Sequence, residues 1–364
     1  MTLNIDKAGQ FCHGGDIYSK ESPLGHWLDY SANINPLGMA DSVKKSIMAS
    51  IDGLVHYPDP QGRELKQAIS ARYDIPVENI ILGNGAAELF YVYFHAMRPG
   101  RVLLPVPSFS EYEKSARCCG AQVDYFFLKE EEDFQVSLPH LIEVIEGYDA
   151  VILGNPNNPT GRLLEAGALE KFISRAGELK VQVIVDESFL DFLADRARYA
   201  VDSLVANHAN LLVIASMTKF FAIPGLRLGF GLAAADMVER LELHKDVWNV
   251  NSLAQAAGTA ALADREFTAR TIRHTAETVL DMTEKLGRIK GIRIFSPSVN
   301  FVLLDIADSG MQSRELAAAM EKKGILIRDC SSYPGLGDTF VRLAIRKSAE
   351  NRQVLRALAE CLQR

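Results

Sequence analysis

Short apolar runs alternate with amphipathic stretches over the first two thirds of the chain. Apolar runs bounded by turn-forming residues predict buried strands, here at 80–82, 102–105, 123–128, 150–153, 181–185 and 211–215. Apolar positions at helical spacing lie among them, at 86–97, 138–145, 164–179 and 237–243. Because strands that are apolar on both faces need cover on both faces, this alternation predicts an α/β fold with a mostly parallel sheet between helices.

The pattern changes from about residue 268, where the predicted elements no longer alternate regularly. We expect a long helix at about 270–286, then strands at 292–295 and 300–305, a helix at 313–323, strands at 325–328 and 340–345, and a last helix at 349–362. This order is typical of a compact α+β domain. We therefore divide the chain into a large domain at 46–265 and a small domain at 266–364, with 1–45 as an N-terminal arm that joins the small domain.

Composition and charge exclude several classes of partner. The chain has 39 basic and 46 acidic residues, and a net charge of −7 argues against a nucleic-acid or anionic-membrane surface. No apolar run approaches the ~20 residues of a membrane helix, and residues 1–15 lack the apolar core of a signal peptide. The five cysteines lack metal-ligand spacing, so we expect no metal site and a cytoplasmic location.

Residues 216–225, Ser-Met-Thr-Lys-Phe-Phe-Ala-Ile-Pro-Gly, place reactive side chains in an otherwise apolar stretch. A lysine there is costly unless it is neutral, paired or covalently used. Desolvation would lower the pKa of Lys219 and make its amine a nucleophile toward a carbonyl cofactor. The hydroxyls of Ser216 and Thr218 and the guanidinium of Arg227 would suit a phosphate. Taken alone, however, the segment is explained more simply by a loop lysine whose amine lies in solvent.

Polar segments also follow the other predicted strands, at the sheet edge where ligands of α/β proteins bind. A glycine turn, Gly-Asn-Gly-Ala-Ala-Glu, opens a helix at 83–88, and its free N–H groups predict an anion site or a plain turn. Phe109 could stack on a planar ring or pack in the core, and Asn157 lies in a turn-rich segment at 154–161. Asp186 needs a cationic partner, either an arginine or a protonated pyridine nitrogen.

Together these segments resemble fold type I pyridoxal-phosphate enzymes of the aminotransferase class I and II superfamily. The resemblance covers about residues 33–346 and rests on the ordered motifs G-N-G, P-x-F, N-P-N-N-P-T-G, D-E-S-F, S-x-T-K-F and G-L-R-L-G. It implies a large domain with a mostly parallel seven-stranded sheet, a small α+β domain, pyridoxal 5′-phosphate as cofactor, and a homodimer with its active site between the subunits.

The resemblance also implies roles for individual residues. Lys219 is expected to bond covalently to the cofactor aldehyde, and Asp186 to pair with the ring nitrogen. Phe109 would stack on the ring and Asn157 would bind the ring hydroxyl. Tyr57 would reach the site of the neighbouring subunit. The groups expected to hold the cofactor phosphate are Gly85, Ala86, Ala87, Ser216, Thr218 and Arg227.

Two branches of the superfamily fit the chain, and both act on small phosphorylated amino compounds. They are the threonine-phosphate decarboxylases of cobalamin synthesis and the histidinol-phosphate aminotransferases, which use 2-oxoglutarate. A third alternative is a domain that senses an effector without turnover, but the acidic chain has no spare segment for a DNA-binding module. The residues expected to bind substrate are His13, Asn33, Tyr57, Asn157, Arg328 and Arg342.

Three features favour the decarboxylase branch. The first is the N-terminal sequence, where His-Gly-Gly at 13–15 and the segment 29–38 resemble the start of these decarboxylases. The second is Phe189, at a position where histidinol-phosphate aminotransferases carry tyrosine. The third is the segment 332–346, which resembles the C-terminal domain of the decarboxylases. This branch implies conversion of L-threonine O-3-phosphate to (R)-1-amino-2-propanol O-2-phosphate and carbon dioxide. One methyl group separates threonine phosphate from serine phosphate and is worth only about 1–3 kcal/mol in a pocket, so the sequence leaves that choice open.

Overall fold

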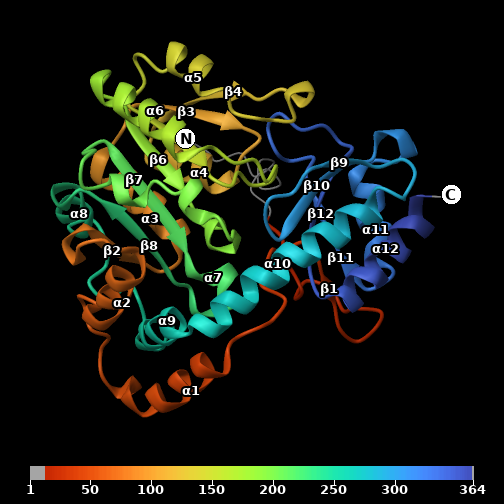
Figure 1. Cartoon of the computed structure of the whole chain (residues 1–364), viewed down its shortest axis with the longest axis horizontal. Helices are drawn as coiled ribbons and strands as arrows, with labels where there is room; N and C mark the ends of the chain where they lie inside the picture. The colour runs from red at the N-terminus through yellow and green to blue at the C-terminus, as the bar shows by residue number, and fades with distance from the viewer. Residues whose placement is uncertain (1–12, 363–364) are drawn as a thin grey trace.

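A computed structural model describes residues 13–362, in which a seven-stranded sheet and a four-stranded sheet each carry their own helices (Figure 1). The order of the large sheet is β2 (Ile80–Gly83), β8 (Gly229–Ala233), β7 (Leu211–Ser216), β6 (Gln182–Asp186), β5 (Ala150–Gly154), β3 (Arg101–Val106) and β4 (Gln122–Phe127). Strand β8 is antiparallel to both of its neighbours, and the other neighbouring strands are parallel. The predicted α/β class and mostly parallel sheet are therefore confirmed.

The large sheet is apolar on both faces because helices cover both faces. In β6, Val183 and Val185 belong to one core, whereas Ile184 between them belongs to the other. Alternate residues of a strand point to opposite faces, so a fully buried strand has to be apolar at consecutive positions. One core includes residues of α2 (Arg63–Tyr73), α5 (Leu138–Val144), α6 (Ala166–Glu178) and α9 (Ser252–Ala263); the other includes residues of α3 (Ala86–Met97), α4 (Ser110–Cys118) and α8 (Ala235–Glu242).

The small sheet is antiparallel and has its own core. Its order is β12 (Arg328–Asp329), β13 (Phe340–Ala344), β10 (Phe301–Asp305) and β9 (Arg293–Phe295), and its helices are α11 (Ser313–Glu321) and α12 (Ser348–Leu362). A short parallel pair, β1 (Leu28–Asp29) with β11 (Ile325–Leu326), attaches the N-terminal segment to this part of the chain. Two further helices are α1 (Asp41–Ser50) and α7 (Met217–Phe220).

Helix α10 (Arg265–Leu286) links the two parts (Figure 1). Its first turn buries Phe267 in the core of the large sheet, and its last turns bury Met282 and Leu286 in the core of the small one. The helix begins five residues before the predicted start because the Asp264 carboxylate accepts a hydrogen bond from the Phe267 N–H at 2.9 Å and caps it. Because α10 packs into both cores, it does not mark a boundary between them. The domain boundaries at 45/46 and 265/266 stay a prediction.

Other differences from the predicted elements also have physical reasons. The sequence does not predict β8, because its Gly-Phe-Gly start is poor in strand-forming residues. The single strand predicted at 325–328 is wrong: β11 and β12 are separate strands that pair in different sheets.

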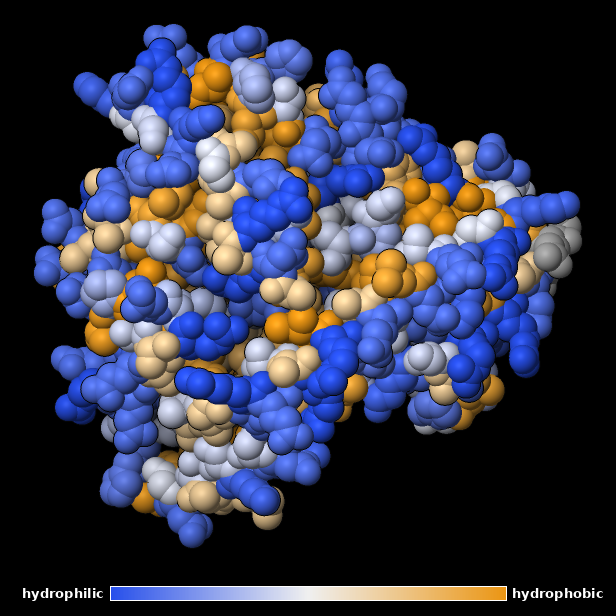
Figure 2. Space-filling view, in the orientation of Figure 1, coloured by the Kyte–Doolittle hydropathy of each residue, from blue (hydrophilic) through white to orange (hydrophobic). Residues whose placement is uncertain are grey.

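On the face shown in Figure 2, hydrophilic residues surround small, separate groups of apolar residues. Between residues 13 and 362, no helix has both the length and the apolar composition that crossing a bilayer requires.

Candidate active site

A cavity of about 720 Å³ lies where the carboxyl ends of β6 and β7 meet the N-terminal segment and the small sheet. Its volume is in the range of small-molecule and cofactor sites. Most of the predicted site residues line it together: His13, Asn33, Ala86, Ala87, Phe109, Asp186, Ser216, Thr218, Lys219, Arg227 and Arg342. The predicted residues Gly85, Tyr57, Asn157 and Arg328 are not part of the lining.

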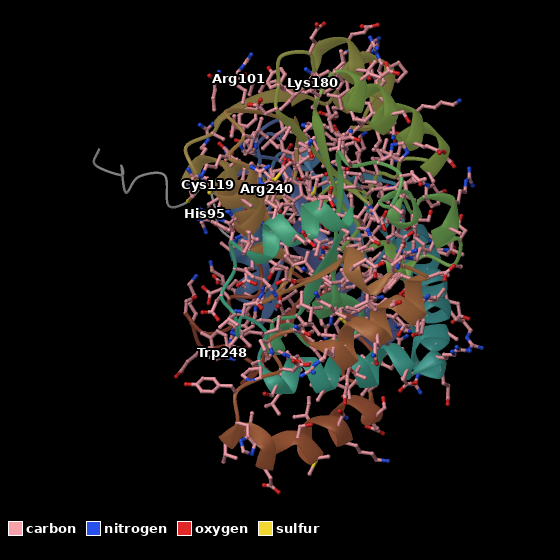
Figure 3. The ribbon with its side chains drawn as sticks, turned by 90° about the vertical axis from the view of Figure 1, so that its left-hand side faces the viewer. His95, Arg101, Cys119, Lys180, Arg240 and Trp248 are labelled. Carbon is pink, nitrogen blue, oxygen red and sulfur yellow. The ribbon has the colours of Figure 1, made fainter. Side chains whose placement is uncertain are left out.

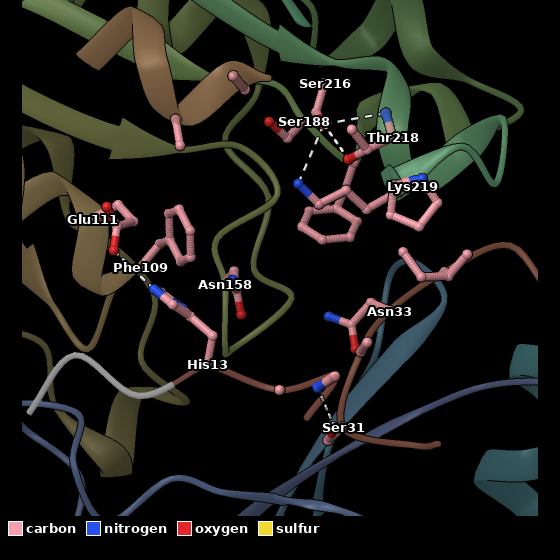
Figure 4. Close-up of a pocket in the computed structure, with 18 of the residues that line it drawn as sticks. His13, Ser31, Asn33, Phe109, Glu111, Asn158, Ser188, Ser216, Thr218 and Lys219 are labelled. Carbon is pink, nitrogen blue, oxygen red and sulfur yellow. Dashed lines mark hydrogen bonds and ion pairs between the residues drawn. The ribbon is translucent and has the colours of Figure 1, made fainter. Parts of the chain in front are cut away.

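Lys219 lies just beyond β7, in the short helix α7. Its Nζ is 3.2 Å from the hydroxyl of Ser216 and 5.7 Å from the centre of the Phe189 ring (Figure 4). Burial lowers the pKa of Lys219 to about 8; Asp186 opposes this shift, and Arg227 and Arg342 add to it. The amine is therefore easier to deprotonate than an ordinary lysine, as a nucleophile toward an aldehyde requires.

This pKa predicts how uptake of pyridoxal phosphate depends on pH. Below about pH 8 the Lys219 amine holds its proton and cannot attack an aldehyde, and above it the amine is free. We expect the rate of uptake by the apoprotein, followed by absorbance, to rise to about pH 8 and then level off. A lysine with the ordinary pKa of 10.5, such as a model peptide, should still gain rate at pH 10. A protein rate that also keeps rising to pH 10 would contradict the lowered pKa.

Asp186 ends β6 and is held by two donors. One carboxylate oxygen, Oδ1, accepts a hydrogen bond from the N–H of Ser188 at 2.9 Å. The other, Oδ2, accepts one from the hydroxyl of Tyr112 in α4 at 2.6 Å. Burial and the Asp186 charge raise the pKa of Tyr112 well above its usual range, so this hydroxyl stays a donor. Sequence analysis missed Tyr112, although it lies three residues after Phe109 at helical spacing.

Replacing Tyr112 with phenylalanine should destabilise the apoprotein. The Asp186 carboxylate would lose one of its two donors, and a hydrogen bond to a charged group is worth roughly 1.5–3 kcal/mol. Urea unfolding of the apoprotein measures the loss. Tyr30→Phe is the matched control, because the buried Tyr30 hydroxyl donates to the neutral amide oxygen of Asn351 at 2.9 Å and should cost about 1 kcal/mol. Equal losses in the two variants would mean that the Asp186 charge plays no part.

The first turn of α3 and Arg227 form a cradle suited to a phosphate. Ala86 and Ala87 begin α3, and free N–H groups at a helix start attract anions. Gly85 precedes them at φ +84°, and a Cβ built on it would lie 2.4 Å from Nη2 of Arg227. Only glycine lets the backbone approach this guanidinium so closely. The hydroxyls of Ser216 and Thr218, 2.8 Å apart, lie in the same cavity.

Asn157 is buried, and its amide group is engaged within the protein. Its Nδ2 donates to the carbonyl of Pro107 at 3.0 Å and to the hydroxyl of Thr160 at 2.9 Å. The neighbouring Asn158 lines the cavity instead. The predicted contact of Asn157 with the ring hydroxyl therefore stays a prediction, whereas the ring of Phe109 is in the cavity lining as a stacking partner requires.

The two predicted arginines are cross-strand neighbours in the small sheet, but they lie differently. Arg328 and Arg342 pair in the β12–β13 register, and both are buried. Arg342 lines the cavity: it donates to the Asn158 side-chain oxygen and, at 2.7 Å, to the carbonyl of Ser31. Arg328 does not line the cavity, and its guanidinium carbon lies 5.3 Å from the ring centre of the lining residue Tyr333.

Tyr57 lies outside the cavity of its own chain. Its side chain is 76% exposed and its ring stacks on Trp248 at 4.2 Å between centroids; Trp248 lies at the surface in the view of Figure 3. This position is compatible with a tyrosine that reaches another subunit, and that role stays a prediction.

The cavity fits the predicted cofactor group by group. An amine with a lowered pKa suits an aldehyde, a buried carboxylate suits a pyridinium nitrogen, and the cradle around Gly85 suits a phosphate. Among the described residues that line the cavity, two buried polar atoms also lack a hydrogen-bond partner: Nε of Arg342 and Oδ1 of Asn33. Because buried polar atoms are normally satisfied, both are available to a ligand.

An amine, a carboxylate and an anion cradle at the edge of a mostly parallel sheet define an enzyme of the fold type I class. The chain belongs to the aminotransferase class I and II family, whose model matches residues 25–358.

Among the relatives, a provisionally named threonine-phosphate decarboxylase of Caldanaerobacter subterraneus subsp. tengcongensis is 37% identical over 97% of this chain and 94% of its own. The threonine-phosphate decarboxylase of Salmonella typhimurium is 33% identical over 96% of each chain. A solved structure, the histidinol-phosphate aminotransferase from Clostridium acetobutylicum, has a TM-score of 0.86 and 33% identity over 92% of this chain and 98% of its own.

Proposed function

We propose that this protein is a pyridoxal-phosphate-dependent decarboxylase that converts L-threonine O-3-phosphate to (R)-1-amino-2-propanol O-2-phosphate and carbon dioxide, for cobalamin synthesis. One observation carries the proposal: a single cavity is lined by Lys219, Asp186 and Arg342. The lysine and the aspartate provide for the cofactor, and the arginine provides for an anionic substrate group. The decarboxylase relatives in Caldanaerobacter and Salmonella support this choice.

The small sheet supplies the anchor for the substrate phosphate. Arg342 is held in place by the Ser31 carbonyl and the Asn158 side chain, so it is a preorganised donor. Asn33 and His13 line the same space. A phosphate held there would fix the orientation of the rest of the substrate toward Lys219.

The chain's residues divide the chemical work with the cofactor. When bound, pyridoxal phosphate supplies an electron sink for the bond that breaks at Cα. Asp186 favours a protonated ring nitrogen through its charge. The Nζ of Lys219 is the group that delivers a proton to Cα after carbon dioxide leaves, since its pKa of about 8 lets it hold or release one near neutral pH.

Phe189 favours decarboxylation by leaving one wall of the site without a hydroxyl. Its ring is 5.7 Å from Nζ of Lys219 and packs edge-on against Phe301 at 5.0 Å between centroids. A tight polar contact with the leaving carboxylate would stabilise the ground state more than the transition state, because charge leaves that group. An apolar wall avoids this cost.

Two parallel assays test the proposal. The protein loaded with pyridoxal phosphate should release carbon dioxide and aminopropanol phosphate from L-threonine O-3-phosphate, and it should act far more slowly on L-threonine, which lacks the phosphate. In the second assay it should transfer no amino group from histidinol phosphate to 2-oxoglutarate. Glutamate formation in the second assay without carbon dioxide in the first would overturn the proposal in favour of the aminotransferase.

We also propose that two copies form a homodimer in which Tyr57 completes the site of the other subunit. Large apolar side chains are exposed on and just after α1: Met48 (73%), Leu54 (50%), Val55 (83%) and Tyr57 (76%). Exposed apolar groups concentrated in this way are typical of an interaction surface. Light scattering should give twice the monomer mass of 40.1 kDa, and a monomer at working concentration would contradict the dimer.

A further inference from the structure

A hydrogen bond links the N-terminal segment to the far wall of the cavity. Nε2 of His13 lies 2.8 Å from Oε1 of Glu111, which belongs to α4. Figure 4 shows this pair on the side of the cavity opposite Lys219. A carboxylate can only accept, so Nε2 carries the hydrogen. The other ring nitrogen, Nδ1, has no hydrogen-bond partner within residues 13–362 and is free to meet a ligand.

Glu111 is built into the wall as a fixed negative charge. It is 7% exposed, and its two oxygens also accept hydrogen bonds from Tyr91 at 3.0 Å and Lys114 at 3.2 Å. Burial alone would raise the pKa of Glu111, but the hydrogen bonds from His13 and Tyr91 and the charge of Lys114 together outweigh it and hold that pKa at about 2. An imidazolium carries a hydrogen on each ring nitrogen, so with Nε2 bonded to Glu111 its Nδ1 can donate to an anion.

Two glycines bring His13 to this place. Residues 13–15, here called the strap, lie against Ser31: a Cβ built on Gly14 would be 2.1 Å from the Ser31 carbonyl oxygen. The N–H of Gly15 donates to the Ser31 hydroxyl at 2.7 Å. The same Ser31 carbonyl accepts from Arg342, so the strap rests on the residue that positions the arginine.

We propose that Glu111 is a positioning residue: through its bond to Nε2 it holds the His13 imidazole at the cavity, so that Nδ1 donates to the substrate phosphate beside Arg342. Glu111 itself does not touch the substrate. The inference rests on the proposed function, because it takes a phosphorylated substrate as the ligand. It assigns the strap a defined task, which is to add one charge-assisted donor to the anion site.

A double-mutant cycle tests this role. Glu111→Gln keeps a hydrogen-bonding side chain but removes the charge, and should raise KM for L-threonine O-3-phosphate about tenfold with kcat changed less than about twofold. His13→Ala should have a similar effect. If Glu111 acts through His13, the double variant should be no worse than His13→Ala alone. Additive losses would overturn the inference, because they would mean that Glu111 acts independently of the histidine.

Two further variants test whether a rise in KM is specific to the strap and to Glu111. Gly14→Ala disturbs the middle of the strap and should also raise KM, because its Cβ clashes with Ser31. Glu113→Gln is the matched control: it lies on the same helix and is buried, but its carboxylate accepts from Arg117 at 2.6 Å and Tyr125 at 2.7 Å and does not line the cavity. KM in this control should stay within about twofold of the wild type.

Binding of inorganic phosphate to the cofactor-loaded protein separates this inference from the proposed function. Calorimetry should show weaker phosphate binding in Glu111→Gln than in the wild type, whether or not threonine phosphate is decarboxylated. A wild type that binds phosphate in this way but releases no carbon dioxide would sink the proposed function alone. A wild type that decarboxylates threonine phosphate, with an unchanged KM and phosphate affinity in Glu111→Gln, would sink the positioning role alone.

Discussion

Lys219→Ala should lower kcat for threonine-phosphate decarboxylation by at least about 10⁴-fold. On the proposed function, the variant loses the amine that would bond to the cofactor and also the proton carrier at Cα. No neighbour replaces it, because the other groups near its position in the cavity are hydroxyls, the Asp186 carboxylate, the Phe189 ring and guanidinium groups, none of which is an amine. Steady-state release of carbon dioxide measures the loss.

A labelling experiment shows whether this loss comes from the cofactor bond. Borohydride should fix pyridoxal phosphate to the wild type on the peptide that contains Lys219, and should fix none on the variant. Lys114→Ala is the control, since Lys114 also lines the cavity but is paired with Glu111 at 3.2 Å. This control should still be labelled on Lys219. Label on Lys114 in the wild type would contradict the assignment of the catalytic lysine.

Arg342→Ala should raise KM for L-threonine O-3-phosphate by about 10²-fold and change kcat much less. A buried arginine–phosphate contact is worth about 2–5 kcal/mol when one partner is removed, which corresponds to at least 30-fold in affinity. On the proposed function the arginine holds the phosphate and not the carboxylate that leaves, so its loss weakens ground state and transition state alike. Initial rates over a range of substrate concentrations separate the two constants.

Two comparisons make this result specific to the phosphate. Arg346→Ala is the control, because Arg346 lies four residues after Arg342 but pairs with Glu350 at 3.3 Å and does not line the cavity. KM in this variant should change less than about twofold. The slow reaction with L-threonine, which has no phosphate, should be equally slow in Arg342→Ala and the wild type. A KM for threonine phosphate that stays unchanged in Arg342→Ala would show that another group holds the phosphate.

Much of the fold could be predicted from the sequence because its information is local. Helix α3 has the predicted bounds, and the strands from β2 to β7 were found from apolar runs. The exceptions depend on long-range packing. Strand β8 has glycines that only its neighbours explain: a Cβ on Gly229 would lie 2.4 Å from the N–H nitrogen of Ala86. The division of 325–328 into β11 and β12 depends on which sheet each half joins.

The sequence by itself determined which residues are expected around the cofactor, whereas only the tertiary structure decided which distant residues position those expected around the substrate. Lys219 and Asp186 each follow their own strand, and the carboxyl ends of parallel strands meet at one edge of a sheet. The partners Tyr112 and Asp186 are 74 residues apart, His13 and Glu111 are 98, and Ser31 and Arg342 are 311. Such pairs form where separate elements pack together, and local periodicity carries no record of which distant side chains then face each other. Lys219 could therefore be singled out once its segment was considered together with the other strand ends, but the residues that position His13 and Arg342 became visible only in the folded chain.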